Sequence, residues 1–181
     1  MSESQWFAEI DNITDAVKKE FGSLSAAELN WKANEATWSV GQVLDHLIVI
    51  NDSYEPIIQQ LKGGTYKPIW LGRVKFLVKF FGDFILQSVE PTRKRKMKTF
   101  PIWEPSTSTI DAGIVSKFEL HQNRLKDTIR SCAELIDRGA VISSPANRII
   151  VYRLDRAFDI IIMHEKRHLE QARELNKLRQ A

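Results

Sequence analysis

Apolar residues recur at helical spacing along most of this chain, and this pattern constrains its fold more than any other feature. One segment, 109–137, carries a regular stripe of this kind on one face: Ile110, Ile114, Phe118, His121, Leu125, Ile129, Cys132 and Ile136. No stretch shows the sustained alternation of apolar and polar residues, bounded by hairpin turns, that is typical of β-strands. None of the six prolines falls within residues 106–144 or 146–181, which allows long helices there. The sequence therefore predicts an all-α protein.

The apolar stripes predict four long amphipathic helices, over residues 4–21, 39–61, 109–137 and 154–179. Ser39 followed three residues later by Gln42 has the spacing of a capping box, which marks the start of the second helix. Pro56 predicts a kink within that helix. Residues 68–105 are interpreted as a long crossover that carries an additional short helix over 73–88. A single domain spanning 1–181, folded as a four-helix bundle, fits this length and order.

The net charge of +3 depends on one short run, which contributes five of the 26 basic residues: Arg93, Lys94, Arg95, Lys96 and Lys98. Such a run could bind nucleic acid, but short basic segments match that pattern by chance, and we interpret this one as a solvated loop. The most apolar stretch, 69–89, contains four charged residues, so we expect no contact with a membrane.

The single cysteine, Cys132, excludes an internal disulfide and a cysteine-based zinc cluster. It lies on a core stripe, where we expect it to be an inert packing residue. With no signal peptide visible at the N-terminus, we expect a cytoplasmic location. Histidine and carboxylate remain as candidate metal ligands.

Two histidines near the C-terminus have a spacing suited to binding one metal ion. His164 and His168 are four residues apart on the apolar side of the last helix, so both rings lie on one helix face. His46 lies beside the apolar stripe of the second helix, and three imidazoles could converge in the core. Zinc, nickel and ferrous iron all accept imidazole, and three ligands leave a coordination position open for water or substrate. Histidines packed without a metal are the alternative.

The segment from His164 to His168 also matches H-E-x-x-H, in which the glutamate, here Glu165, is the general base of zinc proteases. A protease needs a third ligand further along the chain. The nearest downstream acids, Glu170 and Glu174, continue the same helix, so we do not favour this interpretation.

Two segments resemble a known family. Residues 38–47, WSVGQVLDHL, are similar to the second-helix motif of the DinB-like superfamily, which ends in its first metal histidine. Residues 164–171, HEKRHLEQ, resemble its last-helix motif, and the basic crossover resembles a subgroup with an extended crossover. The resemblance implies an up-down-down-up bundle (DinB/YfiT-like), metal ligands His46, His164 and His168, and a homodimer. Arg153 departs from the pattern, because it stands near the position of the family's serine or threonine cap.

The resemblance also implies a chemistry. Members of the superfamily use a divalent metal, and several activate a low-molecular-weight thiol for transfer to an electrophile. Coordination favours the thiolate, which is the nucleophilic form. We therefore expect zinc or nickel, with iron as a third option, and a small-molecule substrate attacked by a thiol or by water. A metal-binding, stress-associated interaction module without enzymatic activity is the alternative.

Further residues are candidates around this site. His121 could be a fourth ligand, a proton shuttle or a hydrogen-bonded core histidine. Asp45 precedes His46, but adjacent helix positions point about 100° apart, so it does not readily support the same metal. Candidates for hydrogen bonding around the ligands are Asn51, Asp159 and Glu165, and candidates for lining a substrate pocket are Trp38, Trp70 and Trp103.

Overall fold

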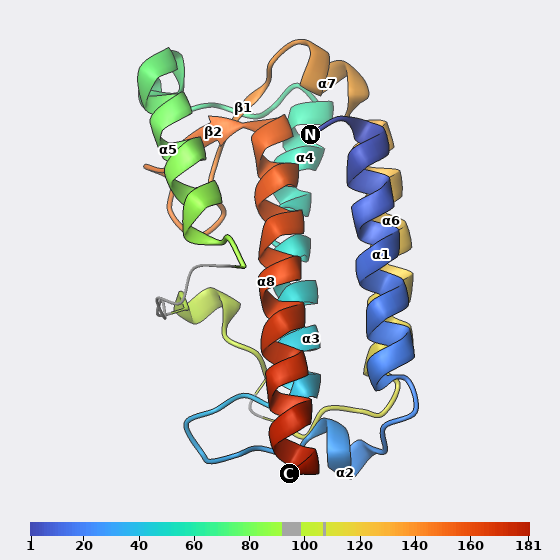
Figure 1. The fold of residues 1–181 in the computed structure, drawn as a ribbon. Helices are drawn as coiled ribbons and strands as arrows, with labels where there is room; N and C mark the ends of the chain where they lie inside the picture. The colour runs from blue at the N-terminus through green and yellow to red at the C-terminus, as the bar shows by residue number, and fades with distance from the viewer. Residues whose placement is uncertain (92–98, 107) are drawn as a thin grey trace.

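The computed structural model describes residues 1–91, 99–106 and 108–181. Its body consists of long helices that pack against one another (Figure 1), and α1 and α3 each contact both α6 and α8. The bounds of these four helices are α1 Glu3–Phe21, α3 Val40–Asp52, α6 Ile114–Ser131 and α8 Leu154–Gln180. The expectation of a mostly helical protein is confirmed. The basic run 93–98 lies outside the described residues.

Shorter elements connect these helices. They are α2 Ala26–Leu29, α4 Glu55–Lys62, the 3-10 helix η1 Trp70–Arg73, α5 Lys75–Ser88, the 3-10 helix η2 Pro101–Trp103, α7 Ala133–Asp137, β1 Val141–Ser143 and β2 Val151–Arg153. The helix expected over 73–88 corresponds to α5, which packs against β2 and α8.

The start of α3 follows from its sequence. Ser39 is the N-cap, and its hydroxyl accepts a hydrogen bond from the backbone N–H of Gln42 at 3.2 Å. The side-chain oxygen of Gln42 in turn accepts from the backbone N–H of Ser39 at 3.2 Å. This capping box satisfies two amides that have no partner within the helix, and the predicted helix start is confirmed.

Two of the predicted helices are each divided in two. The helix expected over 39–61 ends at Asp52, and α4 starts at Glu55 with Pro56 in its first turn. A proline ring clashes with the carbonyl four residues earlier, here that of Asp52, so the chain breaks where a kink was expected. The helix expected over 109–137 starts at Ile114 and is interrupted at Cys132, whose φ and ψ of −99° and 2° are not helical.

The all-α prediction was wrong in one detail, because β1 and β2 form a small antiparallel sheet. Its register pairs Val141 with Arg153 and Ser143 with Val151. Each strand has only three residues, too few to show a period of two in the sequence. Arg153 ends β2 and takes the N-cap position of α8 with extended backbone and no side-chain capping bond. Helix α8 nevertheless starts where the sequence predicted.

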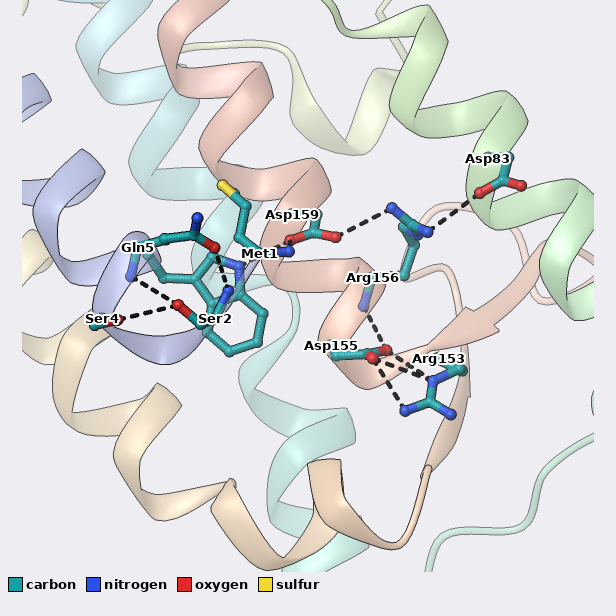
Figure 2. A network of polar contacts seen from close by, with 10 residues as sticks. Met1, Ser2, Ser4, Gln5, Asp83, Arg153, Asp155, Arg156 and Asp159 are labelled. Carbon is teal, nitrogen blue, oxygen red and sulfur yellow. Dashed lines mark hydrogen bonds and ion pairs between the residues drawn. The ribbon is translucent and has the colours of Figure 1, made fainter.

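A polar network fixes α5 and α1 to the first turns of α8 (Figure 2). Arg156 forms ion pairs with Asp83 of α5 at 3.3 Å and with Asp159 at 3.1 Å. Asp159 also accepts a hydrogen bond from the indole nitrogen of Trp6 at 2.8 Å. Beside this network, a Cβ at Gly82 would lie only 3.0 Å from the Arg156 side chain, so the glycine allows α5 to approach α8 closely.

The surface of α5 carries a row of exposed aromatic side chains, Phe76, Phe80 and Phe84. Within the described ranges, no helix is long and apolar enough to cross a membrane.

Candidate metal centre

Three imidazoles from two neighbouring helices meet in the core. His46 comes from α3, and His164 and His168 come from adjacent turns of α8. One ring nitrogen of each lies within 4.8 Å of one ring nitrogen of each of the others. The ring centroids are 5.3 Å apart for His46 and His164, and 4.7 Å apart for His46 and His168. The structure thus brings together the three histidines that the sequence singled out.

The donor set and its spacing suit a transition-metal ion. The Nε2 atoms of His164 and His168 are 3.0 Å apart. Two nitrogen ligands on a tetrahedral zinc ion, each about 2.0–2.1 Å from the metal, are themselves roughly 3.3 Å apart. Small side-chain adjustments would therefore allow both rings to bind one ion. His46 then supplies the third nitrogen from the facing helix.

A backbone carbonyl sets the orientation of His46. Its Nδ1 donates to the carbonyl oxygen of Trp103 in η2 at 2.5 Å, because a carbonyl can only accept. The hydrogen on Nδ1 leaves the Nε2 lone pair free for a metal. Fixing the tautomer in this way through the second ring nitrogen is usual for metal-binding histidines.

Several hydrogen bonds hold η2 and the following residues against α3. The indole nitrogen of Trp103 donates to the Ser53 hydroxyl at 3.1 Å. The side-chain amide of Gln42 donates to the carbonyl of Ser106 at 2.8 Å, and the N–H of Ser106 donates to Asp45 at 3.2 Å. Asp45 thus binds the residue just after the crossover, and it is not one of the three clustered residues.

Trp38 lies against two of the three rings. Its ring centroid is 4.6 Å from that of His46 and 6.0 Å from that of His168, and the indole is nearly parallel to the His168 ring. Of the tryptophans considered for a pocket, Trp38 and Trp103 therefore lie at the cluster. Trp70 is 70% exposed in η1, which contacts the small sheet and α5.

The surroundings keep the three imidazoles neutral. Burial lowers the pKa of His46, although the Trp103 carbonyl opposes this shift. Burial, followed by the neighbouring His168, lowers the pKa of His164 well below its usual value. Burial also lowers the pKa of His168 to about 3. Neutral imidazoles have free lone pairs at neutral pH, which metal binding requires.

Glu165 belongs to a buried polar cluster between α3, α6 and α8. Its two carboxylate oxygens accept hydrogen bonds from the side-chain amides of Asn51 at 2.7 Å and of Gln122 at 2.8 Å. Burial raises the pKa of Glu165 to about 7. Since both oxygens are held by these amides, the carboxylate is not placed as the general base of an H-E-x-x-H protease. Asn51, which the sequence also offered as a hydrogen-bonding residue near the ligands, binds Glu165.

The remaining candidates lie elsewhere. Buried His121 has its Nε2 3.2 Å from Asp52, and it does not join the cluster of the three histidines. Asp159 contacts α1 and Arg156 as described above. Cys132 is fully buried, and burial raises its pKa, as expected of a packing thiol.

Sequence reasoning missed three contributors to these sites: the Trp103 carbonyl, Gln122 and Asp52. Gln122 was detectable, because it lies four residues after Phe118 and three before Leu125, on the buried face of α6. A backbone carbonyl has no sequence signal. Asp52 is the last residue of α3, and it meets His121 because α6 packs on α3. The sequence of α3 alone does not indicate this contact.

Fold and site together define a class: a mostly helical protein with a buried cluster of three histidines on two packed helices. A family model described as the DinB superfamily matches residues 9–172. The chain belongs to the DinB superfamily, a metal-binding family, as the resemblance of its two histidine motifs indicated. No curated protein and no solved structure matched the chain.

Proposed function

We propose that His46, His164 and His168 bind one divalent metal ion, zinc or nickel in preference to iron, and that the protein is a metal-dependent enzyme. The observation that carries this proposal is the approach of three imidazole nitrogens to within 4.8 Å of one another. The reaction we propose is transfer of a low-molecular-weight thiol to an electrophile, or hydrolysis at the same site. Bound there, the ion would act as a Lewis acid that favours the deprotonated thiol or water.

The residues around the cluster have supporting roles in this proposal. The Trp103 carbonyl keeps His46 in the tautomer that binds metal. Trp38 packs against the rings of His46 and His168 and supports their positions. Glu165 and Asn51 hold α8 against α3 through a buried hydrogen bond, which fixes the relative position of the ligands.

A hollow next to Trp38 is the substrate site that we propose. Its volume is about 360 Å³, and its lining among the described residues includes Trp38, Gln42, Thr99 and Glu104 but none of the three histidines, which Trp38 separates from it. This volume is at the small end of typical ligand pockets, roughly 300–1,000 Å³. It therefore suits a small molecule.

The proposal extends to the architecture and setting of the protein. We interpret α1, α3, α6 and α8 as an up-down-down-up four-helix bundle within a single domain of residues 1–181. A cytoplasmic location and a homodimer remain predictions, and light scattering of the purified protein would measure its oligomeric state.

The test is elemental analysis of the purified, untagged protein after dialysis against a weak chelator, beside the variants His46→Ala and His164→Ala. We expect about one metal ion per chain in the original protein and loss of metal in both variants. Circular dichroism would confirm that the variants fold. Absence of metal after incubation with zinc or nickel at neutral pH would contradict the proposed site.

Turnover assays on the metal-loaded protein then separate the candidate activities. Product formed from an electrophile only when a thiol is added supports thiol transfer, whereas turnover without a thiol supports hydrolysis. If chelation lowers the melting temperature while no turnover is found with any thiol or ester, the enzymatic proposal fails in favour of a metal-stabilised interaction module.

A further inference from the structure

The outer face of α5 is apolar and exposed. Helix α5 packs on β2, η1 and α8 with its buried residues Val78 and Gly82, and Figure 1 shows it on the side of α8 away from α1 and α6. On the opposite face, Phe76, Phe80 and Phe84 are 73%, 51% and 52% exposed. Because they are four residues apart, they form one row along the helix. Adjacent rings in the row are stacked, with centroids 6.2 Å apart.

The exposed area of this row is large for a single chain. An aromatic side chain has roughly 150–250 Å² of surface, so the three exposed fractions leave about 350 Å² of aromatic surface uncovered. The largest apolar patch on a typical monomer covers about 300–600 Å² and is often an interaction site. A stable interface buries about 1,200–2,000 Å² in total, and two copies of the row would contribute about 700 Å² of it.

One edge of the row carries charges of both signs. Lys79 and Asp83 lie on the same side of α5, four residues apart, and pair with each other. The Lys79 side chain is 78% exposed and that of Asp83 is 34% exposed. Arg156 of α8 also pairs with Asp83 at 3.3 Å, which holds the carboxylate at this edge. An anionic lipid surface would repel this carboxylate, whereas the same edge of a second copy, running in the opposite direction, would offer it a lysine.

We propose that α5 is the contact face of a homodimer, in which two α5 helices pack antiparallel about a two-fold axis midway between Lys79 and Asp83. In this register Lys79 of each copy lies opposite Asp83 of the other, which forms two equivalent ion pairs. The phenylalanines of the two copies alternate along the contact: Phe80 lies next to Phe80 of the second copy, and Phe76 next to its Phe84. Such a self-complementary face is what two-fold symmetry requires.

This inference rests on the homodimer predicted as part of the proposed function, and it names the surface that forms it. The candidate metal ligands lie on α3 and α8 and not on α5. The contact therefore stands or falls independently of metal binding.

Sedimentation equilibrium of the full chain over a range of concentrations tests the contact face. We expect a monomer–dimer equilibrium whose dissociation constant rises at least about tenfold in Phe80→Ser, since truncating a central aromatic side chain commonly costs an interface that much. Leu120→Ser is the matched control, because Leu120 is 63% exposed on α6, outside the row. Equal dissociation constants of the two variants would overturn the α5 face and leave the homodimer standing. A chain that stays monomeric would contradict both.

Introduced cysteines test the antiparallel register. Native Cys132 is fully buried, so it does not compete. On mild oxidation we expect Phe80→Cys to form a disulfide-linked dimer. Phe76→Cys alone should not, because the two copies of this position lie about 15 Å apart along the helix axis, and the Cα atoms of a disulfide are about 4.4–6.8 Å apart. Mixing Phe76→Cys with Phe84→Cys should give the linked dimer again. Efficient linking of Phe76→Cys to itself would overturn the register.

A lipid surface is the other occupant that an exposed aromatic row could have. Flotation with vesicles of phosphatidylglycerol and phosphatidylcholine distinguishes it from a second copy of the chain. We expect the protein to remain unbound at concentrations where it is dimeric. Vesicle binding that Phe80→Ser abolishes and Leu120→Ser retains would overturn the proposal.

Discussion

The Nδ1 atom of His46 lies 2.5 Å from the backbone carbonyl oxygen of Trp103, so the crossover orients a candidate metal ligand of α3. The contact joins residues 57 positions apart in the sequence. The Trp103 indole anchors this segment, because its nitrogen donates to Ser53, the residue that caps the C-terminus of α3. The candidate metal centre is therefore completed by a segment outside the long helices.

We expect Trp103→Ala to weaken metal binding by about 10–100-fold, the usual effect of removing a partner that orients a metal-binding histidine. The carbonyl stays in the chain, but the anchor of η2 on Ser53 is lost. Competition with a chromophoric chelator would measure the affinity. Trp70→Ala is the control, because Trp70 is exposed in the other 3-10 helix, η1. Equal affinities of the two variants would show that the indole anchor on Ser53 is not needed to hold the carbonyl against His46.

The candidate ligands could be predicted because their relation is local or lies on a regular pattern. His164 and His168 share a helix face by their spacing alone, and His46 borders the apolar stripe of a helix with a clear capping box. The Trp103 carbonyl could not be predicted, because every residue has a backbone carbonyl. The path of the crossover in the folded protein decides which backbone carbonyl contacts the His46 ring.

The same distinction applies to the fold. The four long helices have many turns of apolar periodicity, so their existence and most of their ends could be predicted. Pro56 indicated a disturbance of the helix, but the sequence does not show whether the helix bends there or ends. Packing decides this, and in the structure one helix ends at Asp52 and the next starts at Glu55. The pairing of Val141 with Arg153 joins two three-residue strands, which is too short a pattern to detect.

His121→Gln is expected to leave the metal content unchanged, whereas His164→Gln should abolish it. The Nε2 atom of His121 contacts Asp52, and among the described residues His121 is not part of the cluster of three histidines. Both substitutions replace an imidazole of the helix bundle by an amide, so they form a matched pair. Elemental analysis of the two proteins after the same dialysis would distinguish them. Loss of metal from His121→Gln would make it a fourth ligand.

Asp159→Ala is expected to destabilise the protein by about 1–3 kcal/mol, because it leaves the buried indole N–H of Trp6 without its acceptor. Asp83→Asn, which removes the charge at the other end of the Arg156 bridge, should cost clearly less stability than Asp159→Ala, since both side chains of that pair are one-third exposed. Urea unfolding would give both values. An Asp159→Ala cost no larger than that of Asp83→Asn would contradict the role given to the indole bond.

The last prediction concerns two buried tyrosines. The hydroxyls of Tyr54 and Tyr152 are 2.9 Å apart. Burial raises the pKa of Tyr152 to about 12 and raises that of Tyr54 well above its usual value. Because the folded protein holds these protons more tightly than the unfolded chain, the stability they contribute is complete below pH 10. It is lost as the pH rises from 10 to about 12.

For Tyr152 alone the shift corresponds to a loss of about 3 kcal/mol over that range. The free energy of unfolding in urea, measured from pH 8 to pH 12, should therefore fall with a slope that Tyr152→Phe reduces. Below pH 10 the same variant should be about 1 kcal/mol less stable, since it removes the hydroxyl pair. Tyr66→Phe is the control, because its hydroxyl contacts the backbone of Ser143 and the substitution leaves the buried pair intact. If Tyr152→Phe has the same pH slope as this control, the buried hydroxyl is not the source of the alkaline sensitivity.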